Sequence, residues 1–140
     1  MYAKSFMALD GNGRLTGART AQTAPYDRYS CHLCASALHY HPEYDTERPW
    51  FEHRHDRLTD NGRQHCPYVK PGMRETRHIR QLQSYVPEAR PLVFQADWHC
   101  HGCSSDYHGE RYCMNCRTGE HSYALNDADS RIAEVTACAC

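Results

Sequence analysis

Long apolar runs are missing from this sequence of 140 residues. Its apolar stretches are short, such as Pro91–Phe94 (PLVF), whereas a helix that spans a membrane needs about 20 mostly apolar residues. The first residues, MYAKSFMALDG, carry a lysine but no sustained apolar segment, so they do not resemble a signal peptide. We therefore expect a cytoplasmic protein with no membrane partner.

Large aliphatic side chains are scarce as well, and nine Cys and ten Tyr supply much of the 40% hydrophobic content. A chain of this length forms one ordinary domain or two very small ones. Small domains with a thin apolar core usually need a disulfide or a metal ion to be stable.

Cysteine and histidine are abundant, with nine Cys and eleven His. The odd number of Cys and the expected reducing compartment argue against a disulfide framework. Six of the cysteines instead form C-x2-C pairs, which are Cys31/Cys34, Cys100/Cys103 and Cys113/Cys116. Paired cysteines together with many histidines are typical of zinc sites, and we expect two Zn²⁺ ions per chain.

The two C-terminal pairs have the spacing C-x2-C-x9-C-x2-C, which favours a closed zinc ribbon with four thiolate ligands. The predicted ligands are Cys100, Cys103, Cys113 and Cys116. Nearby histidines that could replace one of them are His99, His101, His108 and His121. Four protein ligands leave no open position for a catalytic water, so this site is predicted to be structural.

The first pair, Cys31 and Cys34, needs two further ligands. Cys66 is the one other cysteine before residue 100, and we expect it to be the third ligand. The candidates for the fourth ligand are His39, His41, His53, His55 and His65. Spacing alone leaves His53 and His55 both tenable. The alternative is that Cys31 and Cys34 bind no metal and stay free or pair with Cys138 and Cys140.

Turn residues between short segments predict several β-strands. Residues 4–17 are predicted to form a hairpin around DGNG, whose glycines tolerate positive φ. Two further strands are expected at Leu38–Tyr40 and Arg48–Glu52, and residues 92–100 are expected to lead as a strand into the second Cys cluster. Residues 58–72 are interpreted as a loop because they contain Asn-Gly and two prolines.

Residues 72–86 form the best helix candidate, since Ile79, Leu82 and Val86, with Tyr85, recur on one face. We expect this stripe to pack between the two zinc modules, and a basic recognition surface is the alternative. The predicted fold is a small, metal-stabilised α+β class, with short β-hairpins around two zinc sites and one intervening helix. Its predicted parts are an N-terminal zinc-finger domain at 1–70, a helical linker at 71–90, and a zinc ribbon with a polar tail at 91–140.

Charge is unevenly distributed, although the formal net charge is −1. Residues 48–90 carry nine Lys/Arg against five Asp/Glu, and residues 91–140 carry three against seven. Zinc bound to four thiolates adds a further net −2, and zinc bound to three thiolates and a neutral histidine adds −1. The zinc-loaded protein is therefore expected to be acidic. This favours a protein partner over nucleic acid, whose phosphates attract basic surfaces.

The alternative is a nucleic-acid or other partner surface made from the basic middle stretch. Its predicted contact residues are Arg54, Arg57, Arg63, Lys70, Arg74, Arg77 and Arg80. The sequence indicates neither the identity of the partner nor the oligomeric state.

Residues 1–70 resemble the N-terminal segment of the CoiA-like competence proteins. The entry pattern of that segment is found here as Gly13, Ala18, Tyr29, Cys31 and Cys34, and its later histidine block is found as Trp50–His53. The resemblance implies that His53 is the fourth zinc ligand and that His55 lies outside the site.

The nuclease domain of CoiA-like proteins has no counterpart in this chain. Such a core needs a Glu-x-Lys type pair, and neither Lys4 nor Lys70 follows a glutamate two residues earlier. We therefore expect a protein that is not an enzyme.

The chain is also similar to short zinc-ribbon proteins encoded on enterobacterial mobile genetic elements. The shared arrangement is Pro49–His53 and His65–Tyr68, followed by a Cys-rich end. This resemblance implies a bacterial zinc protein. A regulatory factor that acts on another protein fits the resemblance and the size of the chain.

Cys138 and Cys140 stand within the final TACAC. They could bind a further metal with His121, form an exposed redox pair, or belong to a frayed terminus. We favour the frayed terminus, because terminal residues are usually poorly ordered.

Overall fold

The computed structural model describes residues 2–125. The described residues fall into two compact units, and the division between them lies between Val93 and Phe94. The boundaries 1–70, 71–90 and 91–140 stay a prediction, and most of the predicted polar tail, with Cys138 and Cys140, lies outside the described residues. No helix in the described part of the chain is long and apolar enough to cross a membrane.

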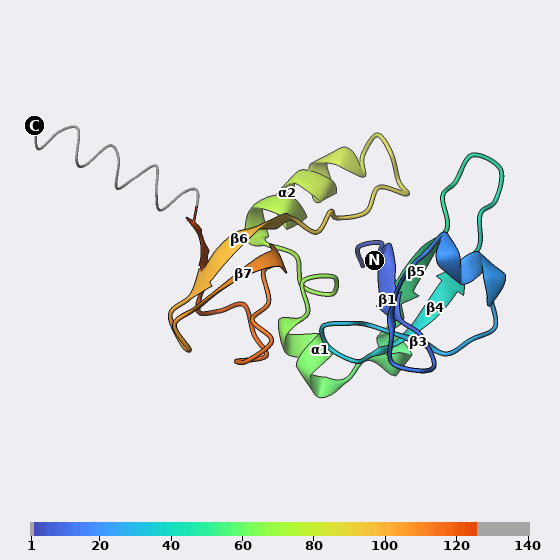
Figure 1. The fold of residues 1–140 in the computed structure, drawn as a ribbon. Helices are drawn as coiled ribbons and strands as arrows, with labels where there is room; N and C mark the ends of the chain where they lie inside the picture. The colour runs from blue at the N-terminus through green and yellow to red at the C-terminus, as the bar shows by residue number, and fades with distance from the viewer. Residues whose placement is uncertain (1, 126–140) are drawn as a thin grey trace, which may run out of the picture. The chain divides into compact units, whose positions relative to one another are not determined.

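The first unit is built on a five-stranded antiparallel sheet with the strand order β2-β1-β3-β4-β5 (Figure 1). Its strands are β1 (Met7–Leu9), β2 (Leu15–Gly17), β3 (Tyr29–Ser30), β4 (Ala37–His41) and β5 (Trp50–His53). Its helices are the 3-10 helices η1 (Thr20–Thr23) and η2 (His55–Arg57) and the α-helices α1 (Asp60–His65) and α2 (Met73–Leu82).

The β1–β2 hairpin is fixed by its turn. The Asp10 carboxylate accepts the backbone N–H groups of Asn12 at 2.8 Å and Arg14 at 3.0 Å. Gly13 has φ +77°, a conformation that glycine adopts without steric cost. These features bring Leu9 opposite Leu15.

The sheet closes on itself just before β1. The Ser5 N–H donates to the Phe51 carbonyl at 3.0 Å, and the Phe51 N–H donates to the Ser5 carbonyl at 2.7 Å. Since β1 also pairs with β3, and β4 with β3 and β5, these strands form a small closed ring.

Three aromatic side chains, in place of aliphatic ones, fill the space that these strands enclose. The centroids of Tyr29, Tyr40 and Phe51 lie 5.0–5.7 Å apart. The Tyr29 hydroxyl donates to the Ala24 carbonyl at 2.6 Å, and the Tyr40 hydroxyl donates to the Ala18 carbonyl at 2.8 Å. Both phenols therefore satisfy their polar groups while burying their rings, which explains how a chain poor in Leu, Ile and Val forms this core.

The helices differ in part from the sequence-based expectation. The segment 58–72, predicted as a loop, contains α1, and that prediction is wrong. The helix predicted over 72–86 spans Met73–Leu82. Ile79 is buried, but Leu82 is 37%, Val86 43% and Tyr85 85% exposed. The expected packing of the stripe is therefore wrong except at Ile79.

The second unit is a three-stranded antiparallel sheet with the order β7-β6-β8. Its strands are β6 (Gln95–Cys100), β7 (Ser105–Glu110) and β8 (Ser122–Ala124). Strand β6 ends at Cys100 and pairs with β7 over its whole length. The turn of this hairpin is therefore the first C-x2-C pair of the ribbon.

Candidate metal centres

The first candidate centre consists of Cys31, Cys34, His53 and Cys66, whose ligand atoms all lie within 4.8 Å of one another. All four side chains are buried, with exposures of 0–2%. The sulfur atoms of Cys31 and Cys66 are 3.8 Å apart. The His53 Nε2 lies 3.9 Å from the Cys34 sulfur and 3.7 Å from the Cys66 sulfur.

Zinc fits these distances. Two thiolates bound tetrahedrally to zinc at about 2.3 Å stand roughly 3.8 Å from each other, and a thiolate and an imidazole stand roughly 3.5 Å apart. All seven described cysteines are free thiols. Three sulfurs and one imidazole nitrogen converging in a buried space form the ligand set of a closed structural zinc site.

Helix α1 carries the chain to Cys66. The Thr59 hydroxyl caps the helix by accepting the Gly62 N–H at 3.0 Å, and it donates to the Cys34 carbonyl at 2.8 Å. The Thr59 N–H donates to the Ser36 hydroxyl at 3.0 Å, which lies 3.1 Å from the Cys34 sulfur. One short helix is thereby fixed directly to the first cysteine pair.

Thr59, Ser36 and Gly62 were not predicted as parts of the site. A signal was present, because a threonine followed by Asp-Asn is a typical helix N-cap. The Asn-Gly step within the helix favoured the loop interpretation instead.

The second candidate centre consists of Cys100, Cys103, Cys113 and Cys116. The Cys100 and Cys116 sulfurs are 3.6 Å apart, and the Cys103 and Cys113 sulfurs are 3.5 Å apart. Cys100 and Cys113 are buried, and Cys103 and Cys116 are half-buried. Four sulfurs at these distances again fit a tetrahedral zinc ion.

The three cysteine pairs share one backbone conformation. The residue that follows each pair has positive φ: Ala35 at 63°, Ser104 at 56° and Arg117 at 57°. The Ala35 N–H donates to the Cys31 carbonyl at 2.9 Å, and the Arg117 N–H donates to the Cys113 carbonyl at 2.6 Å. The same tight turn therefore orients the thiols in both units.

The thiols of the first centre do not ionise independently. Hydrogen bonds with Cys31 and Cys66 lower the pKa of Cys34. The hydrogen bond with Cys34 raises the pKa of Cys31 to about 12, and the hydrogen bond with Cys31 also raises the pKa of Cys66. One thiolate is thus favoured in the cluster, and a cation is needed to ionise the other two thiols.

The second centre follows the same pattern. Hydrogen bonds with Ser105 and Cys113 lower the pKa of Cys103 to about 6. A hydrogen bond with Cys100, together with burial, raises the pKa of Cys116 to about 12.

Among the candidate histidines of the first centre, the structure brings His53 to the cluster. The rings of His53 and Tyr68 are stacked, with centroids 5.5 Å apart. His55 begins η2, and its Nδ1 is hydrogen-bonded to the Tyr2 hydroxyl at 3.2 Å. His39 and His41 lie on β4 opposite Glu52 and Trp50, and His65 ends α1.

In the second unit the candidate histidines lie beside the thiols rather than among them. His99 is paired with Asp106 at 2.5 Å, and His108 with Asp97 at 2.8 Å. The His101 and His121 rings lie edge to face, with their centroids 5.6 Å apart.

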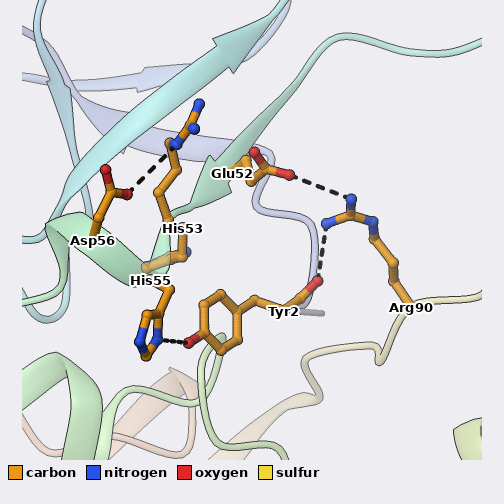
Figure 2. A pocket seen from close by; sticks show the side chains of 7 residues that line it. Tyr2, Glu52, His53, His55, Asp56 and Arg90 are labelled. Atoms are coloured by element: carbon orange, nitrogen blue, oxygen red, sulfur yellow. Dashed lines mark hydrogen bonds and ion pairs between the residues drawn. The ribbon is translucent and has the colours of Figure 1, made fainter.

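An open cleft of about 550 Å³ lies beside His53 (Figure 2). Its lining residues are Tyr2, Glu52, His53, Arg54, His55, Asp56 and Arg90. Arg90 closes part of this cleft, because it donates to the Glu52 carboxylate at 3.3 Å and to the Tyr2 carbonyl at 3.2 Å. The polar groups of the cleft are therefore largely paired with one another.

The predicted basic contact residues are all exposed, and they are distributed over several elements. They are Arg54, Arg57, Arg63, Lys70, Arg74, Arg77 and Arg80. Arg54 precedes η2, Arg57 is the last residue of η2, Arg63 lies on α1, and the last three lie on α2.

Comparison with protein families finds two matches. Residues 93–138 match a family described as a probable zinc-ribbon, in agreement with the four-cysteine cluster of the second unit. Residues 2–88 match the family described as a domain of unknown function, DUF7828. No curated protein and no solved structure matches the chain. The chain therefore carries a probable zinc ribbon and belongs, through the larger part of its length, to the DUF7828 family.

Proposed function

We propose that this protein is a non-enzymatic interaction module that engages a protein partner and acts as a regulatory factor. We also propose that it is cytoplasmic, and the resemblances in its sequence support a bacterial protein encoded on a mobile genetic element, with a first unit related to the CoiA-like N-terminal segment. The carrying observation is that both metal centres are closed sets of four protein ligands, all buried in the first centre and buried or half-buried in the second. Such centres stabilise a fold and offer no position for a substrate or water.

Zinc in this role supplies folding free energy. Cys31, Cys34 and Cys66 form part of an apolar cluster with Ala3 and Tyr68, so the ligands are also core residues. Structural zinc in small domains contributes on the order of 10 kcal/mol. The remaining surface is then free to bind a partner.

Exposed aromatic and apolar side chains next to α2 support a protein partner. Tyr85 is 85% exposed, Met73 is 81% exposed and Leu92 is 75% exposed. Large apolar and tyrosine side chains of this kind are common anchors in protein interfaces.

The test is capture of partners by the zinc-loaded protein, combined with metal analysis. We expect two zinc ions per chain and one stoichiometric protein partner that Tyr85→Ser releases. Tyr26→Ser is the matched control, because Tyr26 is 98% exposed and lies far from α2 in the sequence. If Tyr85→Ser retains the partner as Tyr26→Ser does, the assignment of the interface to the surface around Tyr85 is wrong. One zinc per chain together with titratable free thiols would instead support an enzyme with thiol chemistry.

Nucleic-acid binding is the second candidate, and the arginines of α2 favour it. Arg74 and Arg77 are exposed three residues apart, and they stand on the helix face opposite the buried Ile79. Neither makes an ion pair with a described residue. Binding of DNA or RNA should weaken steeply with salt and be reduced in Arg77→Ala. No affinity at low salt would remove this candidate.

A further inference from the structure

A small cavity lies beside the β4–β5 pair, and none of the residues that line it belongs to either candidate zinc centre. Its volume is about 90 Å³, and it is lined by Leu38, His39, Arg54 and Arg57. Leu38 comes from β4 beside His39, Arg54 follows directly after β5, and Arg57 ends η2. Two arginines and one histidine, from β4 and from the segment that follows β5, thus line one cavity.

The positive charge at this cavity is poorly neutralised. Arg54 lies 3.7 Å from Asp56, but the two side chains are 47% and 71% exposed, and exposed pairs of this kind interact weakly. The Arg57 side chain makes no ion pair or hydrogen bond with the residues that the structure describes, and its backbone N–H donates to the Arg54 carbonyl at 2.9 Å.

The nearest strand carboxylate is engaged elsewhere. Glu52 lies opposite His39, but its oxygens contact His41 at 3.5 Å and Arg90 at 3.3 Å. The pKa of His39 is lowered, mainly by burial and further by the neighbouring His41 and Arg54. The Glu52 carboxylate offsets these effects only in part.

We infer that this cavity, formed by Leu38, His39, Arg54 and Arg57, is a binding site for a terminal phosphate group. Guanidinium groups present paired N–H donors that match the oxygens of a phosphate. The cavity volume of about 90 Å³ has room for one tetrahedral oxyanion, and Leu38 is the one apolar residue of its lining. This favours a phosphate monoester, which enters by its free end, over a diester, which must continue on both sides.

The site does not depend on the protein partner proposed above, because its residues are distinct from those next to α2. Free phosphate and the 5′-phosphate of a nucleic-acid strand present the same chemistry to it. The two sources can therefore be separated only by experiment.

The test follows the His39 ring resonances of the zinc-loaded protein by NMR during titration with inorganic phosphate at constant ionic strength. We expect a saturable shift, and at least about tenfold weaker binding in Arg54→Ala and in Arg57→Gln. Arg14→Ala is the matched control, since Arg14 is an exposed arginine in the β1–β2 hairpin, and it should bind like the wild type. Two zinc ions per chain in each variant confirm that the fold is retained.

Two further comparisons decide whether the bound phosphate is free or belongs to the 5′ end of a nucleic-acid strand. Tighter binding of a 5′-phosphorylated oligonucleotide than of the same strand with a 5′-hydroxyl assigns the site to strand ends. Equal binding of the two strands, with saturable binding of inorganic phosphate, assigns it to free phosphate. A shift that does not saturate, that chloride reproduces, or that persists in Arg57→Gln would overturn the phosphate site.

Discussion

Gly62 lies so close to Cys34 that a β-carbon at position 62 would stand 2.8 Å from the Cys34 sulfur. The same β-carbon would stand 2.6 Å from the Ser36 hydroxyl. Helix α1 can therefore approach the first zinc centre only because this position lacks a side chain. The glycine connects helix packing to metal binding.

Gly62→Ala is accordingly expected to weaken the first centre. Helix propensity alone would make this substitution stabilising by about 1 kcal/mol. The contact with the Cys34 sulfur reverses the sign, and we expect a loss of about 1–3 kcal/mol in the free energy of unfolding. A competition titration with a chromogenic chelator should show weaker binding of one of the two zinc ions.

Gly17→Ala serves as the control for this substitution. A β-carbon there meets only the Phe6 carbonyl at 4.0 Å, so zinc affinity should be unchanged. Equal affinities in the wild type and in Gly62→Ala would contradict the role of the close approach.

The two histidines of the WFEHRH stretch should differ in their effect on metal content. His53→Ala removes a buried ligand and should reduce the zinc content from about two ions per chain to about one. His55→Ala removes a hydrogen bond to Tyr2 and should leave both ions in place. Metal analysis by mass spectrometry measures both outcomes.

A ligand role for His53 also predicts a rescue. His53→Cys supplies a thiolate in place of the imidazole and should restore most of the zinc that His53→Ala loses. Equal zinc loss in the two alanine variants, or no recovery with cysteine, would refute the assignment of His53.

The sequence predicts the zinc sites well because ligand spacing is a local property. Three C-x2-C pairs are sufficient to predict two zinc ions, and two clusters fit them. The choice between His53 and His55 is different, since both positions have the same parity along an extended strand. It depends on where β5 ends, and the chain turns into η2 immediately after His53 and Arg54.

Helix α1 is an element that the sequence does not predict. Its residues are interpreted as a turn because Asn61-Gly62 is a common turn sequence. The hydrogen bond from Thr59 to the Cys34 carbonyl and the close approach of Gly62 to Cys34 depend on residues more than twenty positions away along the chain. The local propensity of a sequence gives no information about such tertiary contacts.

Ala35 offers a test of the shared turn conformation. Its φ of 63° costs about 1–2 kcal/mol for a residue with a β-carbon. Ala35→Gly relieves this cost but gives the unfolded chain more freedom, which offsets about 0.4–1 kcal/mol. We expect a net stabilisation of about 0.5–1 kcal/mol in denaturant unfolding of the zinc-loaded protein.

The matched control is Ala24→Gly, an exposed alanine with φ −142°. Because φ is negative here, glycine relieves no positive-φ cost, and stability should fall by about 0.4–1 kcal/mol. If both glycine variants lose stability, the turn after Cys34 stores no conformational cost.

Zinc binding should release protons, and its affinity should therefore rise with pH. The pKa values of Cys31 and Cys116 are raised to about 12, and those of Cys66 and Cys113 are also raised. These four thiols are protonated at neutral pH without metal, whereas each must be a thiolate to bind zinc.

Because protons compete with zinc at these thiols, lowering the pH weakens binding and raising it strengthens binding. Calorimetry at pH 7 in buffers of different ionisation enthalpy should give a release of about four protons or more for two zinc ions. The apparent zinc affinity should increase steadily between about pH 6 and pH 8. An affinity independent of pH over this range would mean that the thiols are already ionised in the metal-free protein, in conflict with the hydrogen-bonded clusters that raise their pKa values.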